Sequence, residues 1–315
     1  MKKIAYLVSA VAAGLGFSTA AQADVTVSGS GGLEVLSAGS TTTVFQGGSV
    51  TFALSTTTAS GIAISTSSGW GIDSDAADTD ASGAQEFTAL SFAAGGNTVT
   101  FATALELPAG GGVGGVSKDL VSEGLLAGSA SAGAGDHTGH GIQLSTAMGS
   151  ASLTVGYVYS STPASSTNNA ATSGDTSAFG VSVSMPMGPM TLTVNHAQDN
   201  NASSSETGGN IAYAIGGGTL KVGYLDDASA GSAAATEISG AYSMNLDADT
   251  TFAVGYKSTD EGTNNTTVTE VALTRAMGGG VSLFLDYSSV GGATASASGL
   301  AANNSAVAFG TNIAF

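Results

Sequence analysis

Acidic side chains carry most of the chemistry that this sequence could perform. Residues 106–138 interrupt the alternating pattern of the rest of the chain, and they hold four acids against a single base, Lys118. The four acids are Glu106, Asp119, Glu123 and Asp136. A connection of about thirty residues inside a compact protein is usually functional or disordered. The stretch therefore predicts a negatively charged site that attracts cations.

A second acidic group places four carboxylates within eight residues: Asp73, Asp75, Asp78 and Asp80. Ca²⁺ takes about six to eight oxygen ligands, so a long loop could wrap these aspartates around one ion. The segment lacks the glycine and the closing glutamate of a helix-loop-helix calcium site. A solvated acidic loop is the favoured interpretation, and Ca²⁺ is the one candidate cofactor.

Histidine and serine give no comparable signal. His137 and His140 are three residues apart beside Asp136, but neither a strand nor a loop places residues at that spacing on one face. Serines occur throughout the chain, and none stands in a recognisable relation to a histidine and an acid. The sequence therefore predicts no catalytic residues and no enzyme activity.

The elements that position these acids are short alternating segments. Sixteen of them, an even number, are found between Val25 and Phe315. In one, Leu153 and Val155 alternate with Thr154 and Gly156, so that one face is apolar and the other is small or polar. Alternation of this kind is typical of half-buried β-strands. A soluble β-sandwich would show it as well.

The lengths of the connections distinguish a soluble β-sandwich from a β-barrel in a membrane. Short links such as residues 188–189, 216–218 and 278–280 alternate with long ones such as 106–138, 160–176 and 289–304. Short turns at one end and long loops at the other are typical of an up-and-down barrel in a membrane. A β-solenoid would instead show a fixed repeat length, which the sequence lacks.

Charged residues within the strands follow the polar phase. Six of them alternate with the apolar residues and are expected to face the interior of the barrel; they are Glu34, Lys221, Glu237, Lys257, Glu270 and Asp286. A charged side chain on that face destabilises the barrel little, because water reaches it there. Arg275 has the apolar phase near a short turn, where it could extend to the membrane surface or turn inward at a bulge.

The first 23 residues have the features of a secretory signal peptide, with Lys2 and Lys3 before an apolar stretch and Ala21-Gln22-Ala23 at its end. The expected mature domain is residues 24–315. It has four basic residues against 23 acids. This balance argues against nucleic-acid binding, which requires a basic surface. The absence of cysteine excludes disulfides and thiolate metal sites.

Aromatic residues are unevenly distributed. Five tyrosines occur late in odd-numbered segments on the apolar phase and predict an interfacial girdle; they are Tyr157, Tyr159, Tyr224, Tyr256 and Tyr287. The first six segments contain no tyrosine. We therefore expect segments one to five and sixteen to face other subunits, with Trp70 in the second long loop contacting a neighbour.

The last eleven residues place Val307, Phe309, Ile313 and Phe315 in one phase. With the sixteen segments, the signal peptide and the long third loop, this ending resembles the Gram-negative general porins, most of all those of α-proteobacteria. The resemblance implies an all-β fold, a 16-stranded antiparallel transmembrane β-barrel with a long third loop folded into the lumen. It also implies a homotrimer among outer-membrane lipids and lipopolysaccharide, whose terminal Phe315 is read by the outer-membrane assembly machinery.

One departure from that family matters for function. General porins set basic residues on the wall opposite an acidic loop, whereas segments one to nine here contain no lysine or arginine. The prediction is a water-filled channel for passive diffusion of small hydrophilic solutes that prefers cations, with Glu106, Asp119 and Glu123 as the main constriction residues. The alternatives are a surface adhesin rich in glycine, serine and threonine, and a substrate-selective outer-membrane channel.

Overall fold

The computed structural model describes residues 23–73, 89–108, 113, 138–160, 177–200, 204–228, 234–262, 265–292 and 305–315. Within these residues the chain forms sixteen β-strands, and no helix among them is long and apolar enough to cross a membrane. The strands are β1 (Asp24–Ala38), β2 (Thr41–Thr57), β3 (Ala63–Asp73), β4 (Ala89–Ala94), β5 (Asn97–Glu106), β6 (Thr138–Met148), β7 (Ala151–Ser160), β8 (Ala178–Met187), β9 (Met190–Asp199), β10 (Ser205–Ile215), β11 (Gly218–Ala228), β12 (Ala235–Asn245), β13 (Thr250–Asp260), β14 (Asn265–Gly278), β15 (Val281–Gly292) and β16 (Ser305–Ala314).

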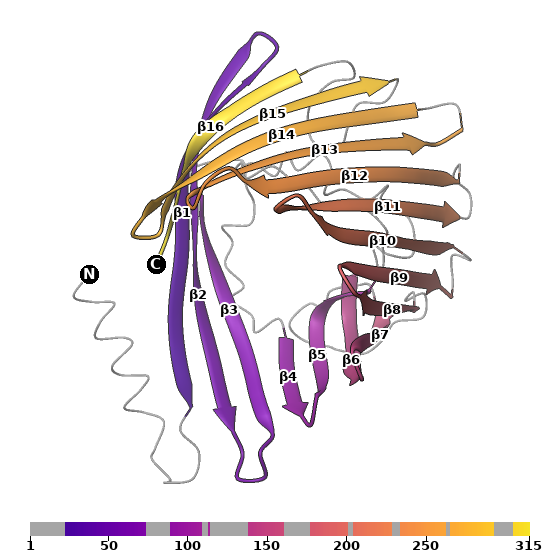
Figure 1. Cartoon of the computed structure of the whole chain (residues 1–315). Helices are drawn as coiled ribbons and strands as arrows, with labels where there is room; N and C mark the ends of the chain where they lie inside the picture. Colours follow the sequence, from indigo (N-terminus) through magenta and orange to yellow (C-terminus); the bar gives the residue numbers. More distant parts are fainter. Residues whose placement is uncertain are drawn as a thin grey trace, which may run out of the picture.

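The strands form one closed antiparallel barrel in chain order (Figure 1). Each strand pairs with its neighbours in sequence, and β1 closes the ring by pairing with β16, from Ser30 opposite Ala314 to Ala38 opposite Ala306. Closure leaves no strand edge exposed. The predicted 16-stranded antiparallel all-β barrel is confirmed. A barrel of this strand number is wide enough to enclose an aqueous channel.

Tight turns connect the strands at one end of the barrel. In the β4–β5 turn, Gly95 and Gly96 have φ angles of 58° and 81°, which side chains with a Cβ rarely adopt and which match the twist of a hairpin. Most of the longer connections fall in ranges outside the described residues, among them 74–88, 114–137 and 161–176. Because β1 and β2 are longer than the alternation predicts, the first connection is a two-residue turn at Gly39 and Ser40.

The third strand also differs from the prediction. Trp70 lies in β3 opposite Val50, and its ring packs against Phe52 with a centroid distance of 5.9 Å. The placement of Trp70 in the second long loop was therefore wrong. The cause is the run of serine and glycine before Trp70, which hides the alternation while still pairing with β2.

The closing seam has an additional contact beyond the strand ladder. Phe315 exchanges two backbone hydrogen bonds of 3.0 Å with Gly29 of β1. The Phe315 ring occupies the space that a side chain at Gly29 would fill, since a Cβ there would approach the Phe315 ring closely. The ring is 74% exposed, so it covers Gly29 on one side and faces outward on the other.

Candidate functional site

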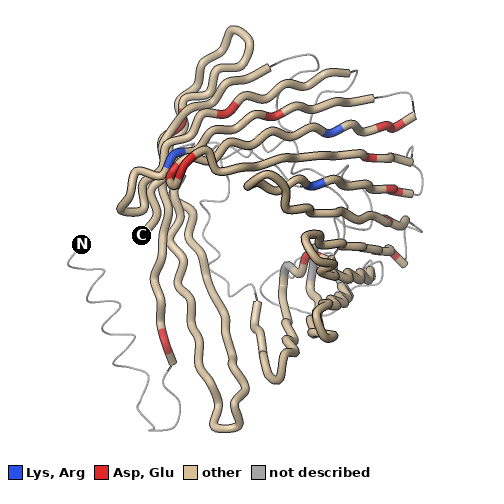
Figure 2. The backbone as a smooth tube through the Cα atoms, in the orientation of Figure 1, with Lys and Arg blue, Asp and Glu red and all other residues tan. Residues whose placement is uncertain are grey.

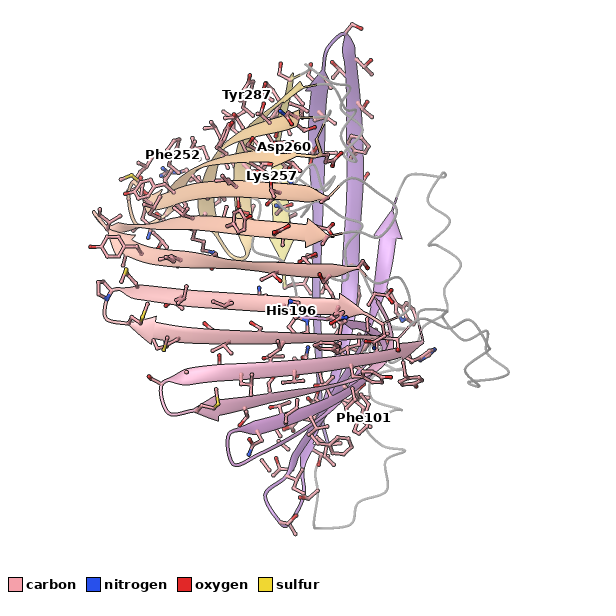
Figure 3. All side chains as sticks on the ribbon, turned by 90° about the vertical axis from the view of Figure 1, so that its right-hand side faces the viewer. Phe101, His196, Phe252, Lys257, Asp260 and Tyr287 are labelled. Carbon is pink, nitrogen blue, oxygen red and sulfur yellow. The ribbon has the colours of Figure 1, made fainter. Side chains whose placement is uncertain are left out.

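The barrel wall has two faces of opposite character. Large apolar side chains alternate along the strands with buried or small ones, and on β15 Leu283, Leu285 and Tyr287 are 41–50% exposed while Phe284 and Asp286 are buried. We call the first set the apolar face and the alternate set the polar face. On β13, Phe252 belongs to the apolar face and Lys257 to the polar face (Figure 3).

Seven acids on seven different strands occupy the polar face, and each is at most 3% exposed. We call this set the carboxylate row; its members are Glu34, Asp199, Glu206, Asp227, Glu237, Glu270 and Asp286. All seven take part in hydrogen bonds, ion pairs or other electrostatic interactions. The row extends from β9 to β15 and continues on β1, whereas β6, β7 and β8 have no charged residues (Figure 2).

Two members of the row lie directly opposite each other. Glu206 of β10 and Asp227 of β11 are partners in the strand register, and both are 3% exposed. Side chains at directly opposed positions have Cβ atoms about 4.5–5.5 Å apart. The register therefore brings two acids of the row together on one part of the wall.

Basic residues on the polar face are fewer. The amino group of Lys257 lies 3.8 Å from Glu237 Oε2, and the Lys257 side chain is 9% exposed. Glu270, on the next strand, also interacts electrostatically with Lys257. Lys221 on β11 is exposed. The seven buried acids of the row therefore share the described polar face with two lysines, so acidic side chains outnumber basic ones on this surface.

In the structure, the six charged residues that were predicted to face the interior all lie on the polar face, as the strand alternation predicted. Sequence reasoning missed three members of the row, Asp199, Glu206 and Asp227, because it made the three strands too short and assigned these acids to loops. The signal was present in β11, where Gly223, Leu225 and Asp227 continue one phase up to the last residues of the strand.

The predicted constriction acids have different positions. Glu106 is the last residue of β5, opposite Thr138, and it is exposed; it thus lies where the strand meets the loop, and its role at the constriction stays a prediction. Its neighbours Leu105 and Leu107 are buried at 5% and 3% exposure. Asp119, Glu123 and Asp136 lie outside the described residues, and their role stays a prediction.

The first residues of this connection lie on the polar face of the wall. A bulge in the β5–β6 pairing between Ala102 and Leu105 changes the phase of β5. Leu105 and Leu107 then pack with Val158 of β7 and Ala178 of β8 in one buried cluster. From the sequence, Leu120, Val121, Leu125 and Leu126 could also hold this connection against the inner wall, but all four lie outside the described residues.

The candidate calcium ligands and histidines form no metal site within the described residues. Asp73 ends β3, while Asp75, Asp78 and Asp80 lie outside the described ranges. No group of three or more histidine, aspartate or glutamate side chains is arranged to hold a metal ion in the described part. His140 stacks on Tyr159 at a centroid distance of 6.0 Å, and Nδ1 of His196 is 2.8 Å from the Thr207 hydroxyl.

Arg275 lies at a turn instead of entering the barrel. Its Nη1 donates a hydrogen bond of 3.0 Å to the Thr250 hydroxyl and is 3.6 Å from Asp247 Oδ2. The Asp247 carboxylate accepts backbone hydrogen bonds from Asp249 and Thr250, and the bond from Asp249 is the main cause of its lowered pKa. These contacts fasten the β12–β13 turn to β14.

The fold and the two faces define a class of protein. A closed sixteen-stranded antiparallel barrel, apolar on one face and charged on the other, is the architecture of β-barrel channels in the outer membrane. The chain belongs to the Gram-negative porin family, whose model matches residues 8–296. It is therefore an outer-membrane porin, and family membership favours the channel over the adhesin.

Solved structures show the same fold at low sequence identity. A mutant of the Rh. blastica porin is 13% identical with a TM-score of 0.66, and the match covers 93% of this chain and all of that one. OmpT of Vibrio cholerae, with loop L8 deleted, is 12% identical with a TM-score of 0.68, covering 93% and 99%. An anion-selective porin from Comamonas acidovorans is 15% identical with a TM-score of 0.66, covering 93% and 100%. A search of curated proteins found no significant match.

Proposed function

We propose that this porin forms a water-filled channel for passive diffusion of small hydrophilic solutes and that it prefers cations. In this proposal the apolar face contacts lipid and the polar face lines the lumen. The carboxylate row is the observation that carries the proposal. Rings of acidic side chains along a pore favour cations, because a low-dielectric wall concentrates their field on the water inside.

The fold leaves the sign of the selectivity open. The Comamonas acidovorans protein has the same fold and is described as anion-selective, so the charges on the wall must decide which ion passes. Here the seven acids of the carboxylate row alone outnumber the two lysines on the described polar face. This excess of acids supports preference for cations.

Charge neutralisation tests the preference. In a triple variant with Glu206→Gln, Asp227→Asn and Glu270→Gln, we expect the cation-to-anion permeability ratio to fall about fivefold, which corresponds to about 1 kcal/mol of electrostatic free energy. The ratio is obtained from the reversal potential of planar bilayers in a potassium chloride gradient. The wild-type preference should weaken at about 1 M salt, where the screening length is about 3 Å.

A second variant separates the wall from the loop. Asp119→Asn with Glu123→Gln neutralises the predicted constriction acids and leaves the carboxylate row intact. If only this variant changes the ratio, the connection after β5 sets the selectivity and the row does not. If the wild-type channel favours anions, the proposed preference is wrong, while its assignment as a porin stands.

We also propose that the protein is a homotrimer whose contacts are made by β1 to β5 and β16. These strands have no tyrosine, yet they expose apolar side chains, among them Leu33 (45%), Val44 (62%) and Trp70 (47%). Light scattering in mild detergent, corrected for bound detergent, is expected to give three times the mass of one chain. Trp70→Arg should shift the population toward monomers, and a wild-type monomer would contradict the proposal.

A further inference from the structure

One part of the polar face lacks side chains. Gly156 of β7 and Gly180 of β8 lie directly opposite each other in the strand register, and both are buried. We call this pair the glycine seat. A third glycine, Gly141 of β6, lies nearby on the same face, opposite Val158.

Two residues that follow β5 occupy the space above the seat. A Cβ at Gly156 would lie 2.9 Å from Leu107 Cδ2 and 3.0 Å from Pro108 Cδ. A Cβ at Gly180 would lie 2.9 Å from the Pro108 carbonyl oxygen and 3.1 Å from Leu107 Cβ. Carbon atoms in contact are normally about 3.5–4.0 Å apart. Leu107 and Pro108 can therefore lie this close to the wall only because both seat positions are glycine.

Apolar packing holds Leu107 and Pro108 against the glycine seat. Leu105 and Leu107 are buried with Val158 and Ala178 on a face that has mostly small or polar residues. Burying a leucine side chain is favourable relative to leaving it in water, so this contact holds the segment against the wall. Leu105 packs over Gly141 in the same way, since a Cβ there would approach Leu105 Cδ2 to 2.6 Å. The three glycines and the two leucines thus form one complementary surface.

We propose that the glycine seat holds residues 107–108 against the inner wall and thereby sets the free cross-section of the channel at this height. Gly156 and Gly180 are positioning residues, acting through the segment that they seat. A side chain at either position must displace this segment by about 1 Å toward the lumen to restore normal contacts. The inference rests on the channel function, but it is independent of whether the channel prefers cations.

Disulfide formation tests the contact itself. The chain has no cysteine, so the double variant Leu107→Cys with Gly180→Cys contains only the designed pair. Disulfides require Cβ atoms about 3.5–4.5 Å apart, and the 3.1 Å from Leu107 Cβ to a Cβ at Gly180 is close enough after a small adjustment. We expect most of the folded protein to be cross-linked under mild oxidation, seen as a mobility shift on non-reducing gels. The pair Leu107→Cys with Gly71→Cys, on β3, should stay reduced.

Conductance tests the consequence. Gly180→Val should lower the single-channel conductance by more than the spread between individual insertions, because the displaced segment narrows the lumen. Gly71→Val is the matched control: Gly71 is on the face opposite to exposed Trp70, and a Cβ there meets nothing within 4 Å among the described residues. If Gly180→Val fails to fold, Gly180→Ala provides the smaller step in the same direction.

The outcomes are distinguishable. If the folded Leu107→Cys, Gly180→Cys variant forms no cross-link, the contact between residues 107–108 and the glycine seat is wrong. If Gly180→Val and Gly71→Val have equal conductance, the seat does not set the cross-section of the channel. Neither result bears on the reversal potential. A loss of cation preference with the cross-link intact would contradict the proposed selectivity and leave the seat in place.

Discussion

Replacing Lys257 with methionine is expected to lower the free energy of unfolding by about 3 kcal/mol, because breaking one partner of a buried ion pair leaves the other charge uncompensated. The Lys257 side chain is 9% exposed and the Glu237 side chain 0%, with 3.8 Å between the amino group and Oε2. Glu270 on β14 is 1% exposed and also interacts with this lysine. Urea unfolding in detergent micelles, followed by the fluorescence of Trp70, the only tryptophan, measures the change.

Lys221→Met is the matched control, since Lys221 has the same chemistry on the same face but is exposed. We expect this variant to differ from wild type by less than about 0.5 kcal/mol. Adding Glu237→Leu to Lys257→Met should recover most of the lost stability, because replacing both charges by apolar groups is often neutral. Equal stability of Lys257→Met and wild type would show that the pair contributes nothing to folding.

Much of the fold could be predicted from the sequence because strand alternation has a strict period. In a barrel wall with one apolar face, a shift of one residue would turn every side chain to the wrong face. Leu153, Val155 and Tyr157 show this period plainly, and β7 has the predicted phase. Small residues weaken the signal, which is why β3 was predicted to end before Trp70.

The site could be predicted only in part. Glu270 and Asp286 lie mid-strand, where the phase is clear, and both are on the polar face as expected. Glu206 and Asp227 lie at strand ends, where alternation has few residues to support it. Leu107 could not have been assigned from the period, because a bulge in β5 reverses the phase just before it. That contact depends on the absent side chain of Gly180, two strands beyond β6.

Charge and shape therefore have different origins in this porin. The negative polar face arises from single acids on separate strands, each fixed by the phase of its own strand. The shape near β7 and β8 depends on a long-range fit between Leu107 and the glycine seat. If the carboxylate row sets the selectivity as proposed, selectivity should tolerate changes in loop position, whereas the cross-section should tolerate changes in wall charge.

Replacing Phe315 with alanine is expected to reduce the amount of this porin in the outer membrane about 30-fold, if assembly in the cell depends on recognition of this ring. Truncating an aromatic anchor at an interface typically costs about 2 kcal/mol, which corresponds to that factor in affinity. The ring is 74% exposed, so a second protein could reach it. Quantitative immunoblotting of isolated outer membranes measures the change.

The same variant should fold almost normally once purified. Its backbone hydrogen bonds with Gly29 remain available, and a ring that is 74% exposed buries little area in the barrel itself. Phe309→Ala is the matched control, because Phe309 is 53% exposed on the same face of β16. We expect Phe309→Ala to assemble in cells at close to the wild-type level. If Phe315→Ala also reaches that level, or if it unfolds at a much lower urea concentration than Phe309→Ala, recognition of the ring is not its main role.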